Sequence, residues 1–462
     1  MHPSAIRIAL AAILCLFAIP SAEADVGTPA TTRPNILLIV ADDLGWSDVG
    51  WHGGFAKTPT LDRLVREGVE LDQHYVQPVC TPTRAALLTG RYPGRFGPHV
   101  LSPSNRRALP PDTVSLATAL KSVGYRTHLA GKWHLGAKLE WIPNAYGFDT
   151  SYGTLTGAAD PWTHKYRAGN PYEDTWHRDG KLFREEGNAT ELIAAEALRR
   201  IRQTEKPWFV YVPFHAVHTP VDAPAEFKKL YDGVTFHDDP VKHESRLRMA
   251  AMVSQLDAKT AAFVEALEQT GQRDNTLIVF TSDNGGIESL KNAYVGDVPD
   301  SPLNSENDPL RGQKATLFEG GTRVCAFANW PGRLRPGKFT TPMHAVDWFP
   351  TLAALVGYRP STDLHWDGVN QWPALFEGRA ATEPRTIYIA AAGGQSLRHG
   401  DWKLIRPKKG ELQLFHLSVD PFEKRNLAKS EPQQVAELLA LLEAHYARDV
   451  HQVPDDLQGV AE

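Results

Sequence analysis

Short apolar runs alternate with helical patterns over most of the chain, and this alternation limits the fold more than any other feature. The runs are rich in β-branched and aromatic residues and lie at residues 36–40, 208–212 and 277–280, and a further strand is expected near residues 125–129. Continuous apolar runs of this length are typical of strands buried on both faces. Helical spacing separates them, at residues 61–68, after Cys80, and at residues 113–123 and 249–268. The order predicts an α/β fold with a mostly parallel sheet flanked by helices.

The pattern changes after about residue 370. Short strands with turn residues between them are expected at residues 386–389, 402–405 and 412–415, which indicates a small antiparallel sheet. A last amphipathic helix places its apolar side chains on one face, namely Val435, Leu438, Leu439, Leu442 and Tyr446. We therefore predict a main α/β domain over residues 25–372 and a C-terminal α+β subdomain over residues 373–462.

The N-terminal 24 residues have the pattern of a signal peptide. Arg7 precedes an apolar run that ends before Pro20, and Ala22-Glu23-Ala24 fits a cleavage site. The run is shorter than the roughly 20 residues that span a bilayer, and no later segment has a transmembrane pattern. We expect an exported protein, periplasmic or secreted in a bacterium and lysosomal or secreted in a eukaryote.

The overall charge limits the class of partner. The chain has 462 residues and a formal net charge of −5, with no long basic run. Nucleic acid is therefore not expected as a partner, and an anionic ligand must be attracted by local charge.

Cleavage of the signal peptide would leave two cysteines, Cys80 and Cys325. Two are too few for a disulfide framework, although one bond between them is an open alternative. Cys80 stands directly before an expected helix, in which Thr81 is a candidate cap and Gly90 a stop. The sequence therefore leaves two interpretations of Cys80, a structural thiol and a reactive group.

Polar residues follow each predicted strand of the sheet. Asp42-Asp43 follows the first strand, and Asp283-Asn284 follows the strand at residues 277–280. In a parallel sheet, ligands bind beyond the carboxyl ends of the strands. Carboxylate and amide oxygens suit a hard cation such as Ca²⁺ or Mg²⁺. Either acidic pair alone is as well explained by a cap or turn, but two pairs at matching strand ends predict a metal site.

Cationic groups and histidines are expected near the same edge. They are Arg84, Lys132, His134, His218 and Lys314, and together they form a suitable environment for a tetrahedral oxyanion. Any one of these lysines alone would be read as a surface charge, and any one histidine as a core residue. Their shared placement favours an anion site.

The motifs resemble those of the type I sulfatases. Cys80-Thr-Pro-Thr-Arg84 with Leu88-Thr-Gly-Arg91 matches the family signature, except that Thr83 stands where serine is frequent. Further matches occur in the family's order at residues 41–45, 131–136, 216–220, 282–286, 311–314, 319–321 and 417–427. Within the family the chain looks most like the arylsulfatase B group, the N-acetylgalactosamine-4-sulfatases. The resemblance implies an alkaline-phosphatase-like fold with residues 25–372 as the catalytic domain.

The resemblance also implies a chemistry. Cys80 would be converted to formylglycine by a formylglycine-generating enzyme, and its hydrate would attack the sulfur of a sulfated carbohydrate or an aryl sulfate. Ca²⁺, or else Mg²⁺, would be the cofactor. The implied metal ligands are Asp42, Asp43, residue 80, Asp283 and Asn284. The implied catalytic residues are Cys80, Arg84, Lys132, His134, His218 and Lys314.

Individual roles follow from the same resemblance. Asp283 would accept a proton from the nucleophile, while Lys132, Lys314 and His218 would hold the sulfuryl oxygens. His218 or Lys314 would protonate the departing alcohol, and His134 would deprotonate the second hydroxyl so that sulfate is expelled. The loop residues Asp160, Trp162, His164 and Tyr166 are candidates for a sugar subsite, with loop packing as the alternative.

Two other functions stay open at this point. A formylglycine-dependent phosphonate or phosphate ester hydrolase would use a similar site, because phosphate and sulfate are both tetrahedral anions. A non-catalytic binder of sulfated glycans would keep Cys80 unmodified.

Overall fold

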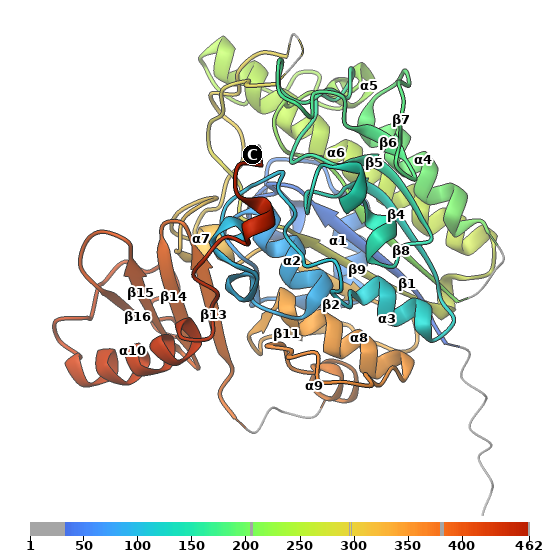
Figure 1. Cartoon of the computed structure of the whole chain (residues 1–462). Helices are drawn as coiled ribbons and strands as arrows, with labels where there is room; N and C mark the ends of the chain where they lie inside the picture. Colours follow the sequence, from blue (N-terminus) through green and yellow to red (C-terminus); the bar gives the residue numbers. More distant parts are fainter. Residues whose placement is uncertain (1–32, 204–206, 295, 297, 379–382, 461–462) are drawn as a thin grey trace, which may run out of the picture. The chain divides into compact units, whose positions relative to one another are not determined.

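The computed structural model describes residues 33–203, 207–294, 296, 298–378 and 383–460 (Figure 1). Residues 33–462 belong to one compact unit. The predicted signal peptide lies outside the described residues. Within the described part of the chain, no helix combines the length and the apolar character needed to cross a bilayer.

A ten-stranded sheet forms the centre of this unit, in the order β11-β2-β10-β9-β1-β8-β4-β5-β6-β7. The pairs β9-β1, β1-β8, β8-β4 and β4-β5 are parallel, which confirms the predicted parallel core, while β10, β6 and β7 pair antiparallel. A separate pair joins β3 to β12. The strands are β1 Asn35–Ala41, β2 Val69–Leu71, β3 His74–Tyr75, β4 Arg126–Lys132, β5 Thr150–Thr154, β6 Trp176–Arg178, β7 Lys181–Leu182, β8 Trp208–Pro213, β9 Thr276–Ser282, β10 Ala326–Asn329, β11 Gly337–Phe339 and β12 Met343–His344.

Helices cover both faces of the sheet (Figure 1). On one face lie α2, α3 and α8, and on the other α1, α4 and α6. The helices are α1 Pro59–Arg66, α2 Cys80–Thr89, α3 Leu116–Ser122, α4 Ala189–Ile201, α5 Ala225–Lys229, α6 Pro240–Gln269, α7 Glu319–Thr322, α8 Trp348–Val356, α9 Trp372–Glu377 and α10 Pro432–Tyr446.

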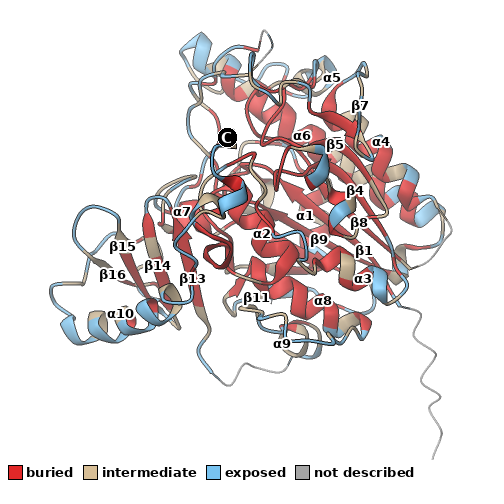
Figure 2. Cartoon of the chain, in the orientation of Figure 1, coloured by how far each residue is buried: buried red, intermediate tan, exposed pale blue. Residues whose placement is uncertain are grey.

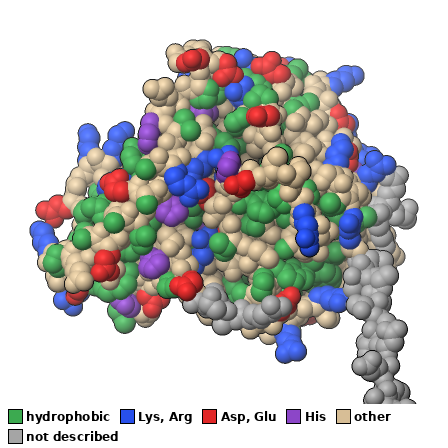
Figure 3. Space-filling model, turned by 60° about the horizontal axis from the view of Figure 1, so that its bottom comes forward, with side chains coloured by type: hydrophobic (Ala, Val, Ile, Leu, Met, Phe, Trp, Pro, Cys, Tyr) green, Lys and Arg blue, Asp and Glu red, His purple; other side chains and the backbone are tan. Residues whose placement is uncertain are grey.

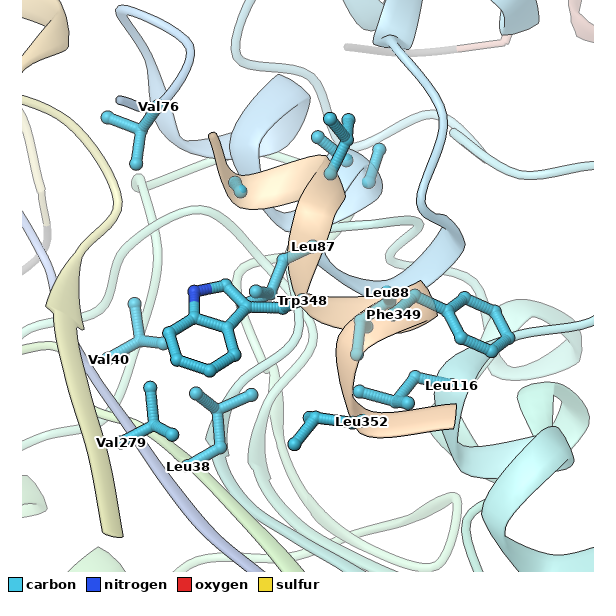
Figure 4. Packing of buried hydrophobic residues seen from close by; sticks show 14 of the residues in the cluster. Leu38, Val40, Val76, Leu87, Leu88, Leu116, Val279, Trp348, Phe349 and Leu352 are labelled. Atoms are coloured by element: carbon cyan, nitrogen blue, oxygen red, sulfur yellow. The ribbon is translucent and has the colours of Figure 1, made fainter. Parts of the chain in front are cut away.

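Strand β1 shows why the two faces are equally apolar. Its residues point alternately to opposite sides, so that Leu38 and Val40 enter one core cluster while Leu37 and Ile39 enter the other. Figure 4 shows Trp348 of α8 packed beside Leu38 and Val40. Burial of each such side chain stabilises the fold by roughly 1.5–3 kcal/mol. A continuous apolar run is thus required by burial on both faces.

Helices α2 and α6 begin at other residues than the sequence predicted. The prediction that Thr81 caps the helix after Cys80 is wrong, because α2 begins at Cys80 itself and its N-cap, Val79, makes no side-chain cap bond. Helix α6 begins at Pro240 rather than at residue 249, with the Asp239 side chain accepting from the amides of Val241 and Lys242. Its first turns are largely polar, so apolar spacing alone did not detect them.

The C-terminal part forms the predicted antiparallel sheet and helix. Four strands, β13 Thr386–Ala391, β14 Gly394–His399, β15 Trp402–Pro407 and β16 Gln413–His416, pair in sequence order. Leu438 and Leu442 of α10 are buried in the same core cluster as Leu397 and Leu404 of the sheet, and the rest of α10 is largely exposed (Figure 2). The division of the chain at residues 372 and 373 stays a prediction.

Charged side chains of both signs lie among one another on the face drawn in Figure 3. This face therefore offers no broad patch of one charge, in keeping with the small net charge of −5.

Candidate active site

The carboxyl ends of β1 and β9 bring the two acidic pairs together. Ala41 of β1 is in register with Ser282 of β9, so Asp42 and Asp283 leave the sheet at the same level. The amide of Asp43 donates to Asp283 Oδ1 at 3.3 Å, and Asn284 Nδ2 donates to Asp43 Oδ1 at 2.7 Å. At Gly285 a Cβ atom would lie 1.8 Å from the carbonyl oxygen of Gly320, so only glycine fits this close approach.

Three cations bind these carboxylates, and each pairing is specific. Lys132 Nζ lies 2.6 Å from Asp42 Oδ2, and Lys314 Nζ lies 2.6 and 2.8 Å from the two oxygens of Asp43. Arg84 donates through Nε and Nη2 to Asp283 Oδ2, at 3.0 and 2.7 Å. We call Asp42, Asp43, Asp283, Asn284, Arg84, Lys132 and Lys314 the site cluster.

Cys80 stands at the N-terminus of α2, at the same place. Its Sγ and carboxylate oxygens of Asp42 and Asp283 all lie within 4.8 Å of one another. All ten residues of α2 are buried, and the Thr83 hydroxyl bonds both the amide and the carbonyl of Gln77, which fixes the chain before Cys80. Neither Cys80 nor Cys325 is in a disulfide, so the alternative of a bond between them is excluded.

The donor set fits a hard divalent cation. Asp42 Oδ1 and Asn284 Oδ1 are buried and accept no hydrogen bond from any described residue. Buried oxygens without a donor are costly, so these two indicate a ligand that the protein's own groups do not replace. Ca²⁺ and Mg²⁺ take such oxygens. His218 Nε2 is 3.6 Å from Asp43 Oδ2, which adds a nitrogen beside the oxygen set.

Burial and neighbouring charges shift the acidic groups in opposite directions. Burial would raise the pKa of Asp43, but the charges of Lys314 and His218 lower it far below its usual range. Burial and the charge of Asp42 raise the pKa of Asp283 to about 6, against the effect of Arg84. Burial also raises the pKa of the Cys80 thiol, more than the charges of Lys132 and Lys314 lower it. The unmodified thiol is therefore protonated at neutral pH and a weak nucleophile.

His134, beside the cluster, is held in its neutral form. Burial and the charges of Lys132 and Arg84 lower the pKa of His134 well below its ordinary value. His134 has a φ of 55°, a left-handed conformation that concentrates at functional sites. At Gly157 a Cβ would lie 2.3 Å from His134 Nε2, so this glycine leaves room for the ring. A neutral, buried imidazole in this position can accept a proton.

A cavity of about 380 Å³ opens above Cys80. His134, His218 and Lys314 line it together with Cys80, so it connects the site cluster to the surface. Every residue that the sequence placed in the catalytic and metal sets lies in this cluster or on this cavity.

The four candidates for a sugar subsite lie in different surroundings. Of the four, Tyr166 alone lines the cavity. His164 stacks on Trp176 and bonds the carbonyl of Gly187, Asp160 accepts from the amides of Trp162 and Thr163, and the Trp162 indole donates to Asp222. These three residues therefore organise the loop.

Sequence reasoning missed several residues of the cavity mouth. Arg167, Lys291 and Tyr294 line it, and none belongs to a motif. Their positions could have indicated them. Arg167 directly follows the candidate Tyr166, and Lys291 and Tyr294 lie in the glycine-rich connection at residues 285–312.

Comparison with known proteins agrees with this geometry. The family model described as Sulfatase matches residues 34–358. Arylsulfatase J of Mus musculus is 32% identical, over 90% of this chain and 76% of its own length. N-acetylgalactosamine-6-sulfatase of Homo sapiens is 33% identical, over 80% of this chain and 72% of its own.

Solved structures give the same picture. The crystal structure of Ps i-CgsB in complex with k-i-k-neocarrahexaose superposes with a TM-score of 0.81 at 32% identity, covering 92% of this chain and 94% of that one. PsFucS1 sulfatase from Pseudoalteromonas sp. gives a TM-score of 0.73 at 26% identity, covering 90% of both chains. These neighbours agree with the predicted alkaline-phosphatase-like fold, and the chain belongs to the sulfatase family.

Proposed function

We propose that this sulfatase removes sulfate from a sulfated carbohydrate or an aryl sulfate by means of a formylglycine formed from Cys80. The observation that carries the proposal is the placement of the Cys80 Sγ within 4.8 Å of Asp42 and Asp283 carboxylate oxygens, below an open cavity. Relatives named for N-acetylgalactosamine-6-sulfate hydrolysis, and a neighbour bound to a neocarrahexaose, support a carbohydrate substrate.

Two groups complete the site under this proposal. Asp42, Asp43, Asp283 and Asn284 would hold Ca²⁺, or Mg²⁺, which when bound lowers the pKa of the nucleophilic hydroxyl and neutralises sulfuryl charge. The hydrate of formylglycine supplies one oxygen for attack on sulfur and a second hydroxyl for the expulsion of sulfate. We propose that a formylglycine-generating enzyme acts on Cys80 and that the protein is exported.

The side chains then divide the remaining work. Arg84 orients Asp283, which takes the proton of the attacking hydroxyl. Lys132, Lys314 and His218 hold the sulfuryl oxygens while the ester S–O bond breaks and a new S–O bond forms. His218 or Lys314 gives a proton to the departing alcohol. His134 removes a proton from the second hydroxyl, so that sulfate leaves and the aldehyde returns.

Peptide mass spectrometry tests the nucleophile. The peptide that contains Cys80 should show the mass of an aldehyde or its hydrate when the protein is made in a host that modifies such cysteines. A thiol in every active preparation would contradict the proposal.

The reaction class is tested by turnover of three probes. Nitrophenyl sulfate should be cleaved faster than nitrophenyl phosphate and than a phosphonate monoester. A preference for the phosphonate or phosphate would favour the ester hydrolase alternative. Binding of sulfated glycans without any turnover, by protein whose Cys80 stays a thiol in a host that modifies such cysteines, would favour the non-catalytic binder.

A further inference from the structure

The mouth of the active-site cavity carries two cations that the proposed reaction does not use. Arg167 and Lys291 line it, and both are exposed. Neither forms an ion pair with a carboxylate anywhere in the described ranges. Lys314, in contrast, is bound to Asp43. The charges of Arg167 and Lys291 are thus available to a ligand.

Arg167 is also held in place. Its guanidinium carbon lies 5.4 Å from the ring centre of Tyr166 and 5.3 Å from that of Tyr294. The two tyrosine rings are 5.6 Å apart, inclined at 49°. Contact with the aromatic rings restricts the side chain, and a hydrogen bond with the Tyr294 hydroxyl adds to this while leaving other N–H groups of the guanidinium to donate. A solvated surface arginine would not be restricted in this way.

This group is continuous with the catalytic residues. The Tyr294 ring centre lies 6.1 Å from that of His218, which itself lies beside Asp43. Two contacts therefore lead from His218, beside the site cluster, through Tyr294 to Arg167. The tyrosine faces offer apolar surface against which a sugar ring can pack.

The charge around the cavity is of one sign. Among the described residues that line it, the charged side chains are Arg167, Lys291 and Lys314, and none is Asp or Glu. The carboxylates of the site cluster are bound to their own cations below. A neutral leaving group would leave the two outer cations unused.

We propose that Arg167, held between Tyr166 and Tyr294 and assisted by Lys291, binds a second anionic group of the substrate. The substrate class is then a carbohydrate with a further sulfate or carboxylate beside the ester that is cleaved. This inference rests on the proposed sulfatase reaction and deepens it. An arginine fork binds either oxyanion through two parallel hydrogen bonds.

Binding to an inactive protein tests the inference independently of turnover. In a Cys80→Ala background, calorimetry compares mono- and disulfated forms of the same hexosamine. The disulfated form should bind at least about tenfold more tightly, because hydrogen bonds between charged groups change an affinity by at least about that factor. Arg167→Gln should remove most of that preference. A disaccharide with one sulfate and one uronate carboxylate shows which anion is preferred.

The controls separate a contact from a structural role. Arg184→Gln makes the same change at a side chain that is 80% exposed and outside the cavity, and it should leave both affinities unchanged. Arg167→Lys should keep part of the preference, because it keeps charge but loses the fork. The inference is overturned if Arg167→Gln lowers the affinity for both sugars equally. It is also overturned if the Cys80→Ala protein binds the two sugars equally well.

Turnover distinguishes this failure from failure of the proposed function. In the modified enzyme, Arg167→Gln should lower kcat/KM for the disulfated sugar about 10- to 100-fold and change that for nitrophenyl sulfate less than twofold. Wild-type protein that cleaves nitrophenyl sulfate but shows no such difference refutes the Arg167 site alone. Modified wild-type protein that cleaves no sulfate ester refutes the reaction.

Discussion

Two buried charge clusters in this molecule are built differently. One is the site cluster. The other, here called the interface cluster, comprises Tyr75, Glu319, Arg398, Lys403 and Glu423. Lys403 Nζ lies 2.8 Å from Glu319 Oε1 and 2.9 Å from Glu423 Oε1. The other two oxygens accept from the Tyr75 hydroxyl and the Glu319 amide, each at 2.7 Å. Three of these four oxygens accept a hydrogen bond, and the fourth, Glu423 Oε1, is held by the charge of Lys403 without a hydrogen bond. Every carboxylate oxygen of this cluster therefore faces a donor or a cation.

The site cluster lacks this completeness. Asp42 Oδ1 and Asn284 Oδ1 have no donor among the described residues. A buried network that is fully paired stabilises a unique structure, whereas unpaired groups cost free energy unless a ligand pairs them. The interface cluster thus joins β15 to the segment of α7, while the site cluster is arranged for binding.

The largest expected effect comes from removing the nucleophile of the site, which should abolish turnover while the protein keeps its stability. Cys80→Ala should lower kcat for nitrophenyl sulfate by at least about 10⁴-fold, the order seen when a nucleophile is removed. The free energy of unfolding should change by less than about 1 kcal/mol, since a small side chain is lost. Steady-state kinetics and denaturant unfolding measure the two quantities.

The matched control is the second buried thiol. Cys325 is fully buried beside the carbonyl of Gly45 and does not line the cavity. Cys325→Ala should keep kcat within about twofold and cost about 1 kcal/mol or less of stability. Loss of turnover in both variants would show that the assay reports folding rather than a nucleophile.

The interface cluster should behave in the opposite way. Lys403→Met leaves Glu319 and Glu423 buried without their cation, which should destabilise the protein by about 3–5 kcal/mol. The kcat of the remaining folded enzyme should fall less than tenfold. Thermal unfolding and the kinetics of folded protein give these values, and a stability equal to that of wild type would refute the distinction between the clusters.

The sequence predicted the parallel core and the site cluster for a physical reason. Leu37, Leu38 and Ile39 had to be apolar because both faces of β1 are buried. The acids had to follow β1 and β9 because parallel strands end at one edge. Such local rules are visible in a single sequence.

The interface cluster and the cavity mouth were not predictable in this way. Lys403 meets Glu319 across 84 positions of the chain, and nothing in either segment indicates that pairing. Tyr166, Arg167 and Tyr294 meet through loops whose course depends on many small contacts. For the same reason the sequence left two alternatives open for Asp160 and His164, a sugar subsite and loop packing, and their hydrogen bonds within the loop agree with the second.

Cation binding should stabilise the site cluster alone. After chelation, Ca²⁺ at about 100 times its Kd should raise the free energy of unfolding of wild type by about 2.7 kcal/mol. Asp42→Asn should lose most of this gain, because it weakens the oxygen set. Lys403→Met should keep the gain despite its lower stability. An equal gain in Asp42→Asn and wild type, measured by thermal unfolding, would place the cation elsewhere.

Lowering the pH should first reduce the free energy of unfolding through His74, which is next to the interface cluster, rather than through the carboxylates of that cluster. His74 adjoins Tyr75, and its ring bonds Trp348 at 3.0 Å and Thr281 at 3.3 Å. Burial lowers its pKa to about 3. Below the unfolded pKa of about 6.5 the unfolded chain gains a proton that folded His74 does not, so stability falls with pH. Although burial would raise the pKa of Glu319, the charges of Lys403 and Arg323 lower it, so this carboxylate stays ionised in the same range.

Unfolding at several pH values separates the two causes. Between pH 6.5 and 5, His74 should account for a loss of about 2 kcal/mol, at about 1.4 kcal/mol per pH unit. His74→Gln should remove that share, while His365→Gln, at a side chain that is 66% exposed, should leave the slope unchanged. Lys403→Met should flatten the slope, because Glu319 and Glu423 lose the cation that lowers their pKa and the folded protein then takes up protons as the pH falls. A wild-type slope in His74→Gln would show that His74 does not carry this part of the pH dependence.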